Sequence, residues 1–300
     1  MINAEPDLLR AWARNVPPDL PVLIAGPTAS GKSGLALALA RAQGRVVVNA
    51  DALQVYDCWR VLTARPSPED EAAAPHLLYG HVPRDADYSV GHWLRDVAAV
   101  LRDDPRPVIV GGTGLYFSAL TDGLADIPPV PAEVRAQADA RMEAEGAGAL
   151  LADLDAATAA RIDRLNPARI QRAWEVLTAT GHGLAHWQDR TGPPLLPLER
   201  AHALVLRPDP AWLGARIDRR FAQMVQHGAV DEVRAALPHW SPTRPWARAI
   251  GAPELVAHLR GDMTLDQALA AGCIATRQYS KRQRTWMRNR LRHWPAIDLP

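Results

Sequence analysis

Lysine is almost absent from this 300-residue chain: of its 34 lysine and arginine residues, only Lys32 and Lys281 are lysines. A chain that otherwise uses arginine has thus kept a compact cation at very few positions. Cysteine is equally scarce, because Cys58 and Cys273 are the only two. Two cysteines cannot form a disulfide framework or a zinc site of their own, which favours a reducing compartment and predicts a cytoplasmic protein.

Long apolar runs and a strong net charge are also missing. No stretch approaches the length that crosses a membrane, and the first 20 residues lack the apolar centre of a signal peptide. The formal net charge is only +1, so any nucleic-acid binding must come from a local cluster of charge. Hydrophobic residues make up 48% of the chain, which indicates a globular protein. We expect a monomer that makes no contact with membranes.

A glycine-rich loop is the most informative stretch. It lies between an apolar run at 22–25 and a helix-like run at 34–40, the context in which G-x-x-x-x-G-K-[ST] binds a di- or triphosphate. Backbone N–H groups, the helix N-terminus and the lysine would hold the phosphates, and the final serine hydroxyl would hold Mg²⁺. An ordinary glycine-rich turn is the weaker alternative. The loop consists of Gly26, Pro27, Thr28, Ala29, Ser30, Gly31, Lys32 and Ser33.

Two more buried strands are predicted to end at the same edge of a sheet. The apolar run at 46–48 leads to Asp51, and the run at 107–110 leads to a Gly-Gly-Thr-Gly loop that contains Thr113. In open α/β sheets ligands bind at the carboxyl ends of the strands, so Asp51 and Thr113 are expected beside the phosphates. Capping of a helix N-terminus is the alternative role for Asp51.

The order of these elements predicts an α/β protein with a P-loop NTPase-like parallel sheet core. Residues 1–130 form the first part of this core, with a short helix around Leu8–Arg14 before the first strand. Residues 131–195 are rich in alanine and charge and predict an all-helical insertion domain with helices at 132–145 and 167–180. Residues 196–300 complete the core with a strand at 202–206 and a helical C-terminal region.

The last predicted helix carries a one-sided basic stripe. The helix begins at a capping box, residues 264–267, and runs to about residue 292. Its second half, residues 277–292, holds seven basic residues and no acidic one, while Tyr279 and Trp286 fall on the opposite side and could anchor the helix to the core. Such a stripe is typical of a track for a phosphate backbone, and a solvated face is the alternative. Five basic residues lie within an arc of about 80°: Arg277, Lys281, Arg284, Arg288 and Arg292.

These residues leave two reaction classes open. One is a kinase that uses a nucleoside triphosphate and has Asp51 as base toward a small acceptor alcohol. The other is a transferase whose donor is a diphosphate ester and whose acceptor is a nucleic acid. The basic stripe favours the transferase, and a nucleotide-binding switch is a third, weaker possibility.

The motifs, taken in order, resemble the tRNA dimethylallyltransferase family. They run from Gly26 to about Arg288, and although the loop at 26–33 is shared by many families, the ordered set is specific. The chain departs from the family pattern at Ala252-Pro253-Glu254. The matching stretches after the loop are Asp51-Ala52-Leu53-Gln54-Val55-Tyr56, Thr63-Ala64-Arg65-Pro66, Ala74-Pro75-His76-Leu77-Leu78, Gly111-Gly112-Thr113-Gly114-Leu115-Tyr116-Phe117, Arg169-Ile170-Gln171-Arg172-Ala173-Trp174-Glu175-Val176, Arg220-Phe221, Arg248-Ala249-Ile250-Gly251 and the stretch from Thr276 to Trp286.

The resemblance implies transfer of a dimethylallyl group from dimethylallyl diphosphate to N6 of the adenosine at tRNA position 37, in tRNAs that read codons beginning with U. Asp51 would be the general base, and Thr113 would lie beside the acceptor adenosine as the second catalytic residue. The loop at 26–33 and Arg220 would bind the diphosphate, with Ser33 holding the cofactor Mg²⁺. The adenosine would leave its stack to reach the site.

The resemblance also implies which residues contact the tRNA anticodon stem-loop. The helical insertion would grip the anticodon stem, and the basic helix would follow the backbone. Surface charge without RNA contact is the alternative for the arginines of the insertion. The implied tRNA-binding residues are Asp51, Ala52, Leu53, Gln54, Thr113, Arg135, Ala168, Arg169, Ile170, Gln171, Arg172, Arg248, Lys281, Arg282, Gln283, Arg284, Trp286 and Arg288.

Overall fold

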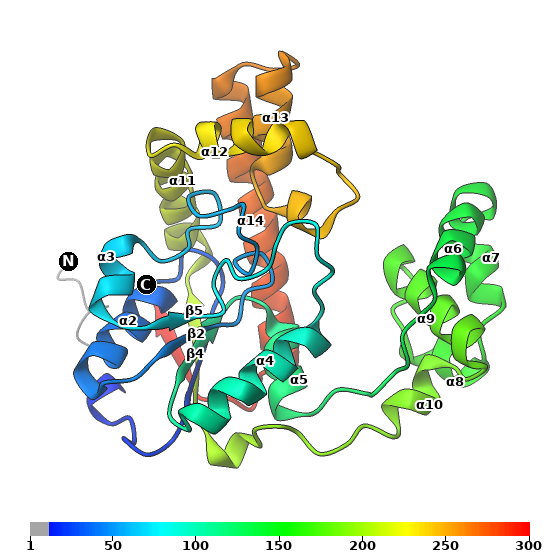
Figure 1. Ribbon diagram of the computed structural model, residues 1–300, viewed down its shortest axis with the longest axis horizontal. Coiled ribbons are helices and arrows are strands. Elements are labelled where there is room, and N and C mark those ends of the chain that lie inside the picture. Colours follow the sequence, from blue (N-terminus) through cyan, green and yellow to red (C-terminus); the bar gives the residue numbers. More distant parts are fainter. Residues whose placement is uncertain (1–11) are drawn as a thin grey trace. The chain divides into compact units, whose positions relative to one another are not determined.

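The computed structural model describes residues 12–300, so most of the helix expected around Leu8–Arg14 lies outside the described residues. The described chain divides into two compact units (Figure 1). We call the first the core; it comprises the residues up to Thr121 together with Leu195–Pro300. We call the second, Asp122–Pro194, the helical unit.

The core is built on a parallel sheet, as the sequence predicts. Among residues 12–300 the sheet has six strands in the order β3-β2-β4-β1-β5-β6, and every pair is parallel. The chain places three strands on one side of β1 and two on the other, so the strand order reverses beside β1 and opens a crevice at the carboxyl ends there. The strands are β1 (Val22–Ala25), β2 (Val47–Asn49), β3 (His76–Leu77), β4 (Val108–Gly111), β5 (His202–Pro208) and β6 (Ala296–Leu299).

Helices cover both faces of the sheet because successive strand side chains alternate between the faces. In β1, Val22 and Ile24 pack with α2 (Lys32–Gln43), whereas Leu23 and Ala25 pack on the opposite face. That second face is covered by α4 (Val90–Asp103), α5 (Gly114–Thr121) and the last turns of α14 (Leu265–Arg290). A strand that is apolar on both faces is buried throughout, which explains the continuous apolar runs in the sequence.

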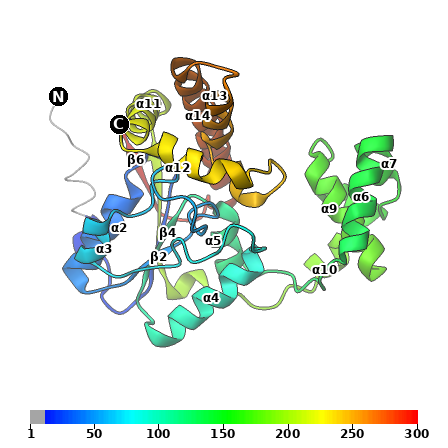
Figure 2. The same ribbon diagram turned by 45° about the horizontal axis from the view of Figure 1, so that its top comes forward.

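Most of the remaining core helices gather around a second apolar cluster, in which Trp59 and Trp246 lie 5.6 Å apart between ring centroids, whereas α3 contacts α2. Figures 1 and 2 show the long helix α14 with α11 and α13 along it, and contacts between the helices agree. The bounds are α3 (Pro68–Ala73), α11 (Pro210–Gln226), α12 (Ala229–Ala236) and α13 (Ala252–Arg260), with short 3₁₀ turns at Leu198–Arg200, Leu237–His239 and Pro245–Arg248.

The helical unit contains no strand among its described residues. Two of its helices match the sequence prediction, because Asn166 accepts a bond from the N–H of Arg169 at one end of α9 and Gly181 ends that helix with φ of 71°. Its apolar centre includes Ala138, Leu150 and Trp174. The helices are α6 (Ala132–Glu145), α7 (Ala147–Ala152), α8 (Ala156–Arg161), α9 (Pro167–Thr180) and α10 (Leu184–Gln188).

The helices of the C-terminal region are followed by a short edge strand, β6, in which Ala296–Leu299 pairs with β5. One expectation needs correction. Ile170 is 2% exposed and packs in the centre of the helical unit, so its side chain is a core residue and not part of an RNA-contacting surface. The run 168–172 lies on an amphipathic helix, so one of its residues must face inward, and that residue is Ile170.

Candidate active site

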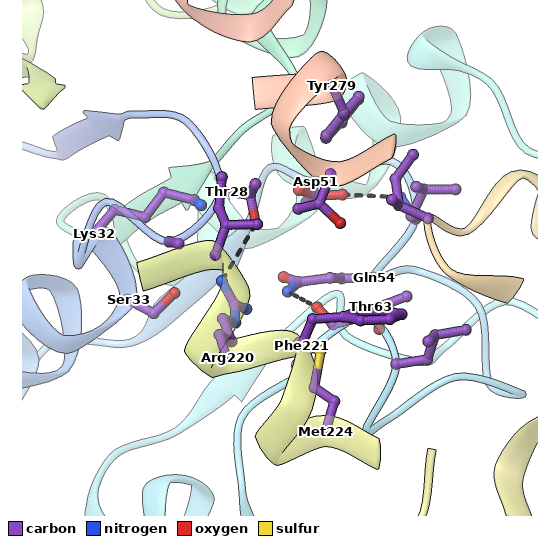
Figure 3. A pocket seen from close by; sticks show the side chains of 16 residues that line it. Thr28, Lys32, Ser33, Asp51, Gln54, Thr63, Arg220, Phe221, Met224 and Tyr279 are labelled. Carbon is purple, nitrogen blue, oxygen red and sulfur yellow. Dashed lines mark hydrogen bonds between the residues drawn. The ribbon is translucent and has the colours of Figure 1, made fainter. Parts of the chain in front are cut away.

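The phosphate-binding loop runs from the end of β1 to the first residue of α2. Ala29 and Gly31 adopt positive φ values of 63° and 89°, which turn the backbone so that α2 begins at Lys32. The ammonium of Lys32 lies 3.4 Å from the carbonyl oxygen of Pro27, folded back over the loop. The Ser33 hydroxyl lines the same pocket as Lys32 (Figure 3). The strand–loop–helix context that the sequence predicts is therefore present.

Two cations of this site are held in a desolvated environment. Burial, with a smaller contribution from Arg220, lowers the pKa of Lys32 to about 8 despite the opposing effect of Asp51. Burial also lowers the pKa of Arg220, whose Nη1 donates to the Thr28 hydroxyl at 3.3 Å. A buried cation whose charge is disfavoured in the free protein gains most when an anion arrives. The site therefore suits a phosphate-bearing ligand.

Asp51 follows the end of β2 and is held by its neighbours. The Asn49 side chain, fully buried, accepts from the N–H of Asp51 at 2.9 Å and donates to its carbonyl at 3.0 Å. Asp51 Oδ1 accepts from the N–H of Leu53 at 3.0 Å, so the carboxylate caps a short turn and no α-helix begins here. These bonds fix the carboxylate where it lines the pocket.

Thr113 joins the loop after β4 to the turn that carries Asp51. Its hydroxyl accepts from the N–H of Ala52 at 2.9 Å, and its own N–H donates to the carbonyl of Ala50 at 3.2 Å. The strand end before it passes so close to this turn that a Cβ on Gly111 would lie 2.0 Å from the Ala50 carbonyl oxygen. Glycine is therefore required there by close backbone approach.

One pocket brings these groups together. Lys32, Ser33, Asp51 and Arg220 line its polar part. Figure 3 shows Arg220 pointing toward Thr28, with Tyr279 near Asp51 and with Phe221 and Met224 away from Lys32. Apolar side chains form the rest of the wall: Leu53, Leu62, Ile217, Phe221, Met224 and Ile250. The pocket can thus hold an anion and a small apolar group side by side.

A second recess opens on the outer side of the same loop. Arg216, Arg219, Arg220 and Gln223 of α11 line it together with the first residues of α2. Arg216 Nε donates to the Ala29 carbonyl at 2.9 Å, and its guanidinium stacks over Trp212. Of these arginines the sequence analysis singled out only Arg220. The spacing of the three arginines on one face of α11 could have pointed to Arg216 and Arg219 as well.

The segment 60–63, of which Leu62 and Thr63 line the pocket, is fixed by a contact that no sequence pattern shows. One carboxylate, that of Glu232, accepts from three successive backbone N–H groups, those of Arg60, Val61 and Leu62. Gln54 secures the other end by donating to the carbonyl of Thr63 at 2.7 Å. Glu232 lies 170 residues away in sequence, so no local pattern could connect it with this wall.

The basic stripe of α14 is mostly exposed, as expected. Lys281 and Arg288 are exposed, as is Arg282 outside the arc, whereas Arg284 is half-buried with an Nε that meets no hydrogen-bond partner. Arg277 is already paired with Asp218 at 3.0 Å. The exposed members of the stripe are therefore available to an anionic partner.

The opposite face of α14 meets the site. Tyr279 lines the pocket, and the Trp286 ring lies against Gly114, where a Cβ would come within 2.1 Å of it. Gln283 is 6% exposed and hydrogen bonds within the core, so its amide faces the two glycine-rich loops and not solvent. This placement differs from the surface position that a tRNA contact by Gln283 implies.

The other expected tRNA-binding residues lie in two places. Arg248 is exposed at the end of a 3₁₀ turn, two residues before Ile250 of the pocket wall. In the helical unit, Arg135, Ala168 and Arg169 are exposed. Two further side chains there already have partners: Gln171 donates to Asp139 at 2.7 Å, and Arg172 pairs with Glu175 at 3.4 Å.

The fold and the site define a class of enzyme. The parallel sheet carries a phosphate-binding loop, and the pocket beside it has a carboxylate and an apolar wall. This arrangement fits a transferase whose donor is a phosphate ester with a small apolar group. Among the described residues no helix is long and apolar enough to cross a membrane.

Comparison with known proteins identifies the family. The model of the IPP transferase family matches residues 54–290, and that of isopentenyl transferases matches residues 21–74. A tRNA dimethylallyltransferase of Cereibacter sphaeroides is 66% identical over 98% of this chain and 94% of its own length. One from Dinoroseobacter shibae is 64% identical over 93% of this chain and 95% of its own. The chain belongs to the IPP transferase family, whose curated members at this similarity are tRNA dimethylallyltransferases.

Solved structures share the fold. The tRNA isopentenylpyrophosphate transferase of Bacillus halodurans superposes with a TM-score of 0.65 at 28% identity, covering 93% of this chain and 90% of its own. A eukaryotic dimethylallyltransferase acting on tRNA superposes with a TM-score of 0.78 at 23% identity, over 93% of this chain and 73% of its own. Because the sequence identity to the eukaryotic enzyme is only 23%, this superposition shows a shared fold alone.

Proposed function

We propose that this protein transfers a dimethylallyl group from dimethylallyl diphosphate to N6 of the adenosine at position 37 of tRNAs that read codons beginning with U. The single observation that carries the proposal is the pocket itself. It places Lys32 and Arg220 at one part, the Asp51 carboxylate at another and an apolar wall between. Family membership supports the reaction class and disfavours a small-molecule kinase.

The leaving group is the diphosphate. The bond between the allylic carbon and the diphosphate oxygen breaks, and its electron pair stays on that oxygen. The loop N–H groups, Lys32 and Arg220 then face the negative charge that develops. Because burial disfavours the charged form of both cations in the free protein, they interact strongly with an anion that excludes water from them.

The acceptor is the exocyclic amine of adenosine. Its nitrogen forms a bond to the allylic carbon and loses a proton, which Asp51 accepts as general base. The bonds from Asn49 and Leu53 hold this carboxylate in place, so it needs no rearrangement to receive the proton. Thr113, tied to the same turn, is placed to orient the adenosine.

The apolar wall explains the choice of a short prenyl chain. Leu62, whose N–H donates to Glu232, lines the pocket together with Ile217, Phe221 and Met224. A five-carbon group can be buried there, and each methylene removed from water contributes about 0.8 kcal/mol. Burial also keeps water away from the reacting carbon, which protects the donor from hydrolysis.

Magnesium is part of the proposal. Among the described residues no group of three or more histidine, cysteine or acidic side chains could hold a metal ion alone. The Ser33 hydroxyl lines the pocket, and such a hard oxygen ligand suits Mg²⁺ when diphosphate oxygens and water complete the set. When bound, Mg²⁺ would neutralise charge on the leaving diphosphate.

The tRNA anticodon stem-loop is the proposed partner. The exposed basic residues of α14 would follow its backbone, and the exposed arginines of the helical unit would hold the anticodon stem. The acceptor base must be unstacked to enter the pocket, which a single-stranded loop permits. We propose that the protein acts in this way as a cytoplasmic monomer.

The test is a labelling experiment. The protein is incubated with Mg²⁺, radiolabelled dimethylallyl diphosphate and unmodified tRNA that has adenosine at position 37. We expect label in this tRNA and none in a matched tRNA with guanosine at that position. Phosphoryl transfer from ATP to a small alcohol, without dependence on tRNA, would establish the kinase instead.

A further inference from the structure

Gln283 connects two loops of the active site that lie far apart in the sequence. Its Oε1 accepts from the backbone N–H of Thr28 at 2.9 Å, and its Nε2 donates to the Gly112 carbonyl at 3.0 Å. Thr28 belongs to the phosphate-binding loop, and Gly112 belongs to the loop that carries Thr113. One amide therefore ties the proposed donor loop to the proposed acceptor loop.

The space around this amide is complementary to it. A Cβ on Gly112 would lie 2.2 Å from Nε2 of Gln283, and a Cβ on Gly114 would lie 2.1 Å from the Trp286 ring. A side chain at either position would require Gln283 or Trp286 to move. The two glycines thus let α14 lie directly against the backbone of the loop, which places the amide between the loops.

Thr28 is held from two helices at once. Gln283 of α14 fixes its backbone N–H, while Arg220 of α11 donates to its hydroxyl at 3.3 Å. Because its N–H points to Gln283, Thr28 does not present that group to the phosphates. Its role is to set the path of the loop before the residues around Lys32.

We propose that Gln283 is a positioning residue of the donor pocket and does not contact tRNA. It fixes the distance between the loop that holds the diphosphate and the loop that supports Asp51 and Thr113. The inference rests on the proposed function for the identity of the two substrates. Its geometric basis, a buried amide with both ends bonded to different loops, is independent of it.

A matched pair of variants tests the proposal. Gln283→Met keeps the length of the side chain but removes both hydrogen bonds, leaving a buried N–H and a buried carbonyl unpaired. Arg282→Met changes the adjacent, exposed residue. For each variant the kcat, the KM for dimethylallyl diphosphate, the Kd for tRNA and the salt dependence of that Kd are measured.

We expect Gln283→Met to lower kcat/KM for the donor about 10- to 100-fold while the tRNA Kd and its salt slope stay within twofold of wild type. Arg282→Met should weaken tRNA binding several-fold and leave the KM for the donor unchanged. Gln283→Glu keeps the acceptor for Thr28 but sets a carboxylate oxygen against the Gly112 carbonyl, so its kcat/KM should also fall below that of the wild type. Loss of tRNA affinity with an unchanged donor KM in Gln283→Met would make Gln283 an RNA contact and overturn the proposal.

Binding of inorganic pyrophosphate separates this inference from the proposed function. Isothermal titration needs no prenyl transfer, and it should show weaker pyrophosphate binding by Gln283→Met than by the wild type. Equal affinities would overturn the positioning role even if the wild type labels tRNA. If Gln283→Met does not fold, Gln283→Glu carries the same comparison with the same two outcomes.

Discussion

Two cations of the active site and one arginine of the helical unit are held in opposite ways. In the core, burial lowers the pKa of Lys32 to about 8 and lowers that of Arg220. In the helical unit, hydrogen bonds to Glu145 and Asp153 raise the pKa of Arg141. The first environment disfavours the positive charge in the free protein, and the second has already neutralised it.

This difference indicates where a substrate anion gains a strong electrostatic interaction and where it gains only a weak one. A desolvated cation that no carboxylate fully neutralises can interact strongly with an anionic substrate. An arginine in an exposed ion pair is already neutralised, and such a pair contributes only about 0–1 kcal/mol. We therefore expect substitutions in the core to act on the reaction and those on exposed surfaces to act on tRNA affinity.

The largest effect is expected from Asp51→Asn. Asparagine can still accept from the N–H of Leu53, so the turn survives, but it cannot take the proton from N6. Single-turnover transfer should fall by about 10²- to 10⁴-fold while pyrophosphate binding is retained. Asp85→Asn, at an exposed carboxylate, is the control and should be fully active. Lost pyrophosphate binding in Asp51→Asn would indicate a metal-binding or structural role instead.

The second effect is a pH dependence set by Lys32. Its pKa of about 8 in the free protein means that the ammonium is charged below pH 8 and neutral above it. Pyrophosphate affinity should therefore lose a contribution as pH rises through 8, by up to about tenfold per pH unit. Titrations of Lys32→Met, which lacks this group, should show only the inflections of pyrophosphate itself. An identical pH profile for wild type and variant would contradict the assignment.

A smaller effect is expected on the exposed face of α14. Lys281→Gln and Arg288→Gln should each weaken tRNA binding and reduce the slope of log K against log salt by about 0.7–0.9, the value for one phosphate contact. Arg277→Gln serves as the comparison, because Arg277 is already paired with Asp218. Filter-binding at several salt concentrations gives the slopes. Unchanged slopes in the first two variants would make the stripe a solvated face.

The smallest effect separates two arginines of the helical unit. Arg172 pairs with Glu175 at 3.4 Å, whereas Arg169 is exposed on the preceding turn. We expect Arg169→Ala to weaken tRNA binding by a few-fold and Arg172→Ala by less, with the donor KM unchanged in both. If Arg169→Ala and Arg172→Ala lowered kcat/KM equally at saturating tRNA, these arginines would affect the reaction itself and not only the affinity for tRNA.

Part of the site was predictable because it depends on residues close in sequence. A strand, a loop with glycine at a positive φ and a helix that begins at Lys32 are local features. The same holds for the turn at Asp51 and for the cap at Asn166, since each is closed by hydrogen bonds over two or three residues. Local backbone geometry leaves a pattern in the sequence.

The rest depended on contacts between distant segments. Glu232 reaches the wall at Leu62 across 170 residues, and Gln283 reaches Thr28 across 255. On α14, the helical period places Gln283 on the side of Tyr279 and Trp286, away from the basic arc, but it cannot say which loops the amide meets. That was decided by the missing side chains at Gly112 and Gly114, which let the helix approach.

The sequence by itself determined the phosphate-binding loop, the carboxylate opposite it and the basic face of the last helix, because these follow from residue type and periodicity. Only the tertiary structure decided which side chains close the pocket, which arginines join Lys32 and which polar groups of α14 turn inward. Burial is the physical reason. It depends on what packs against a residue, and it is the largest cause of the lowered pKa of Lys32.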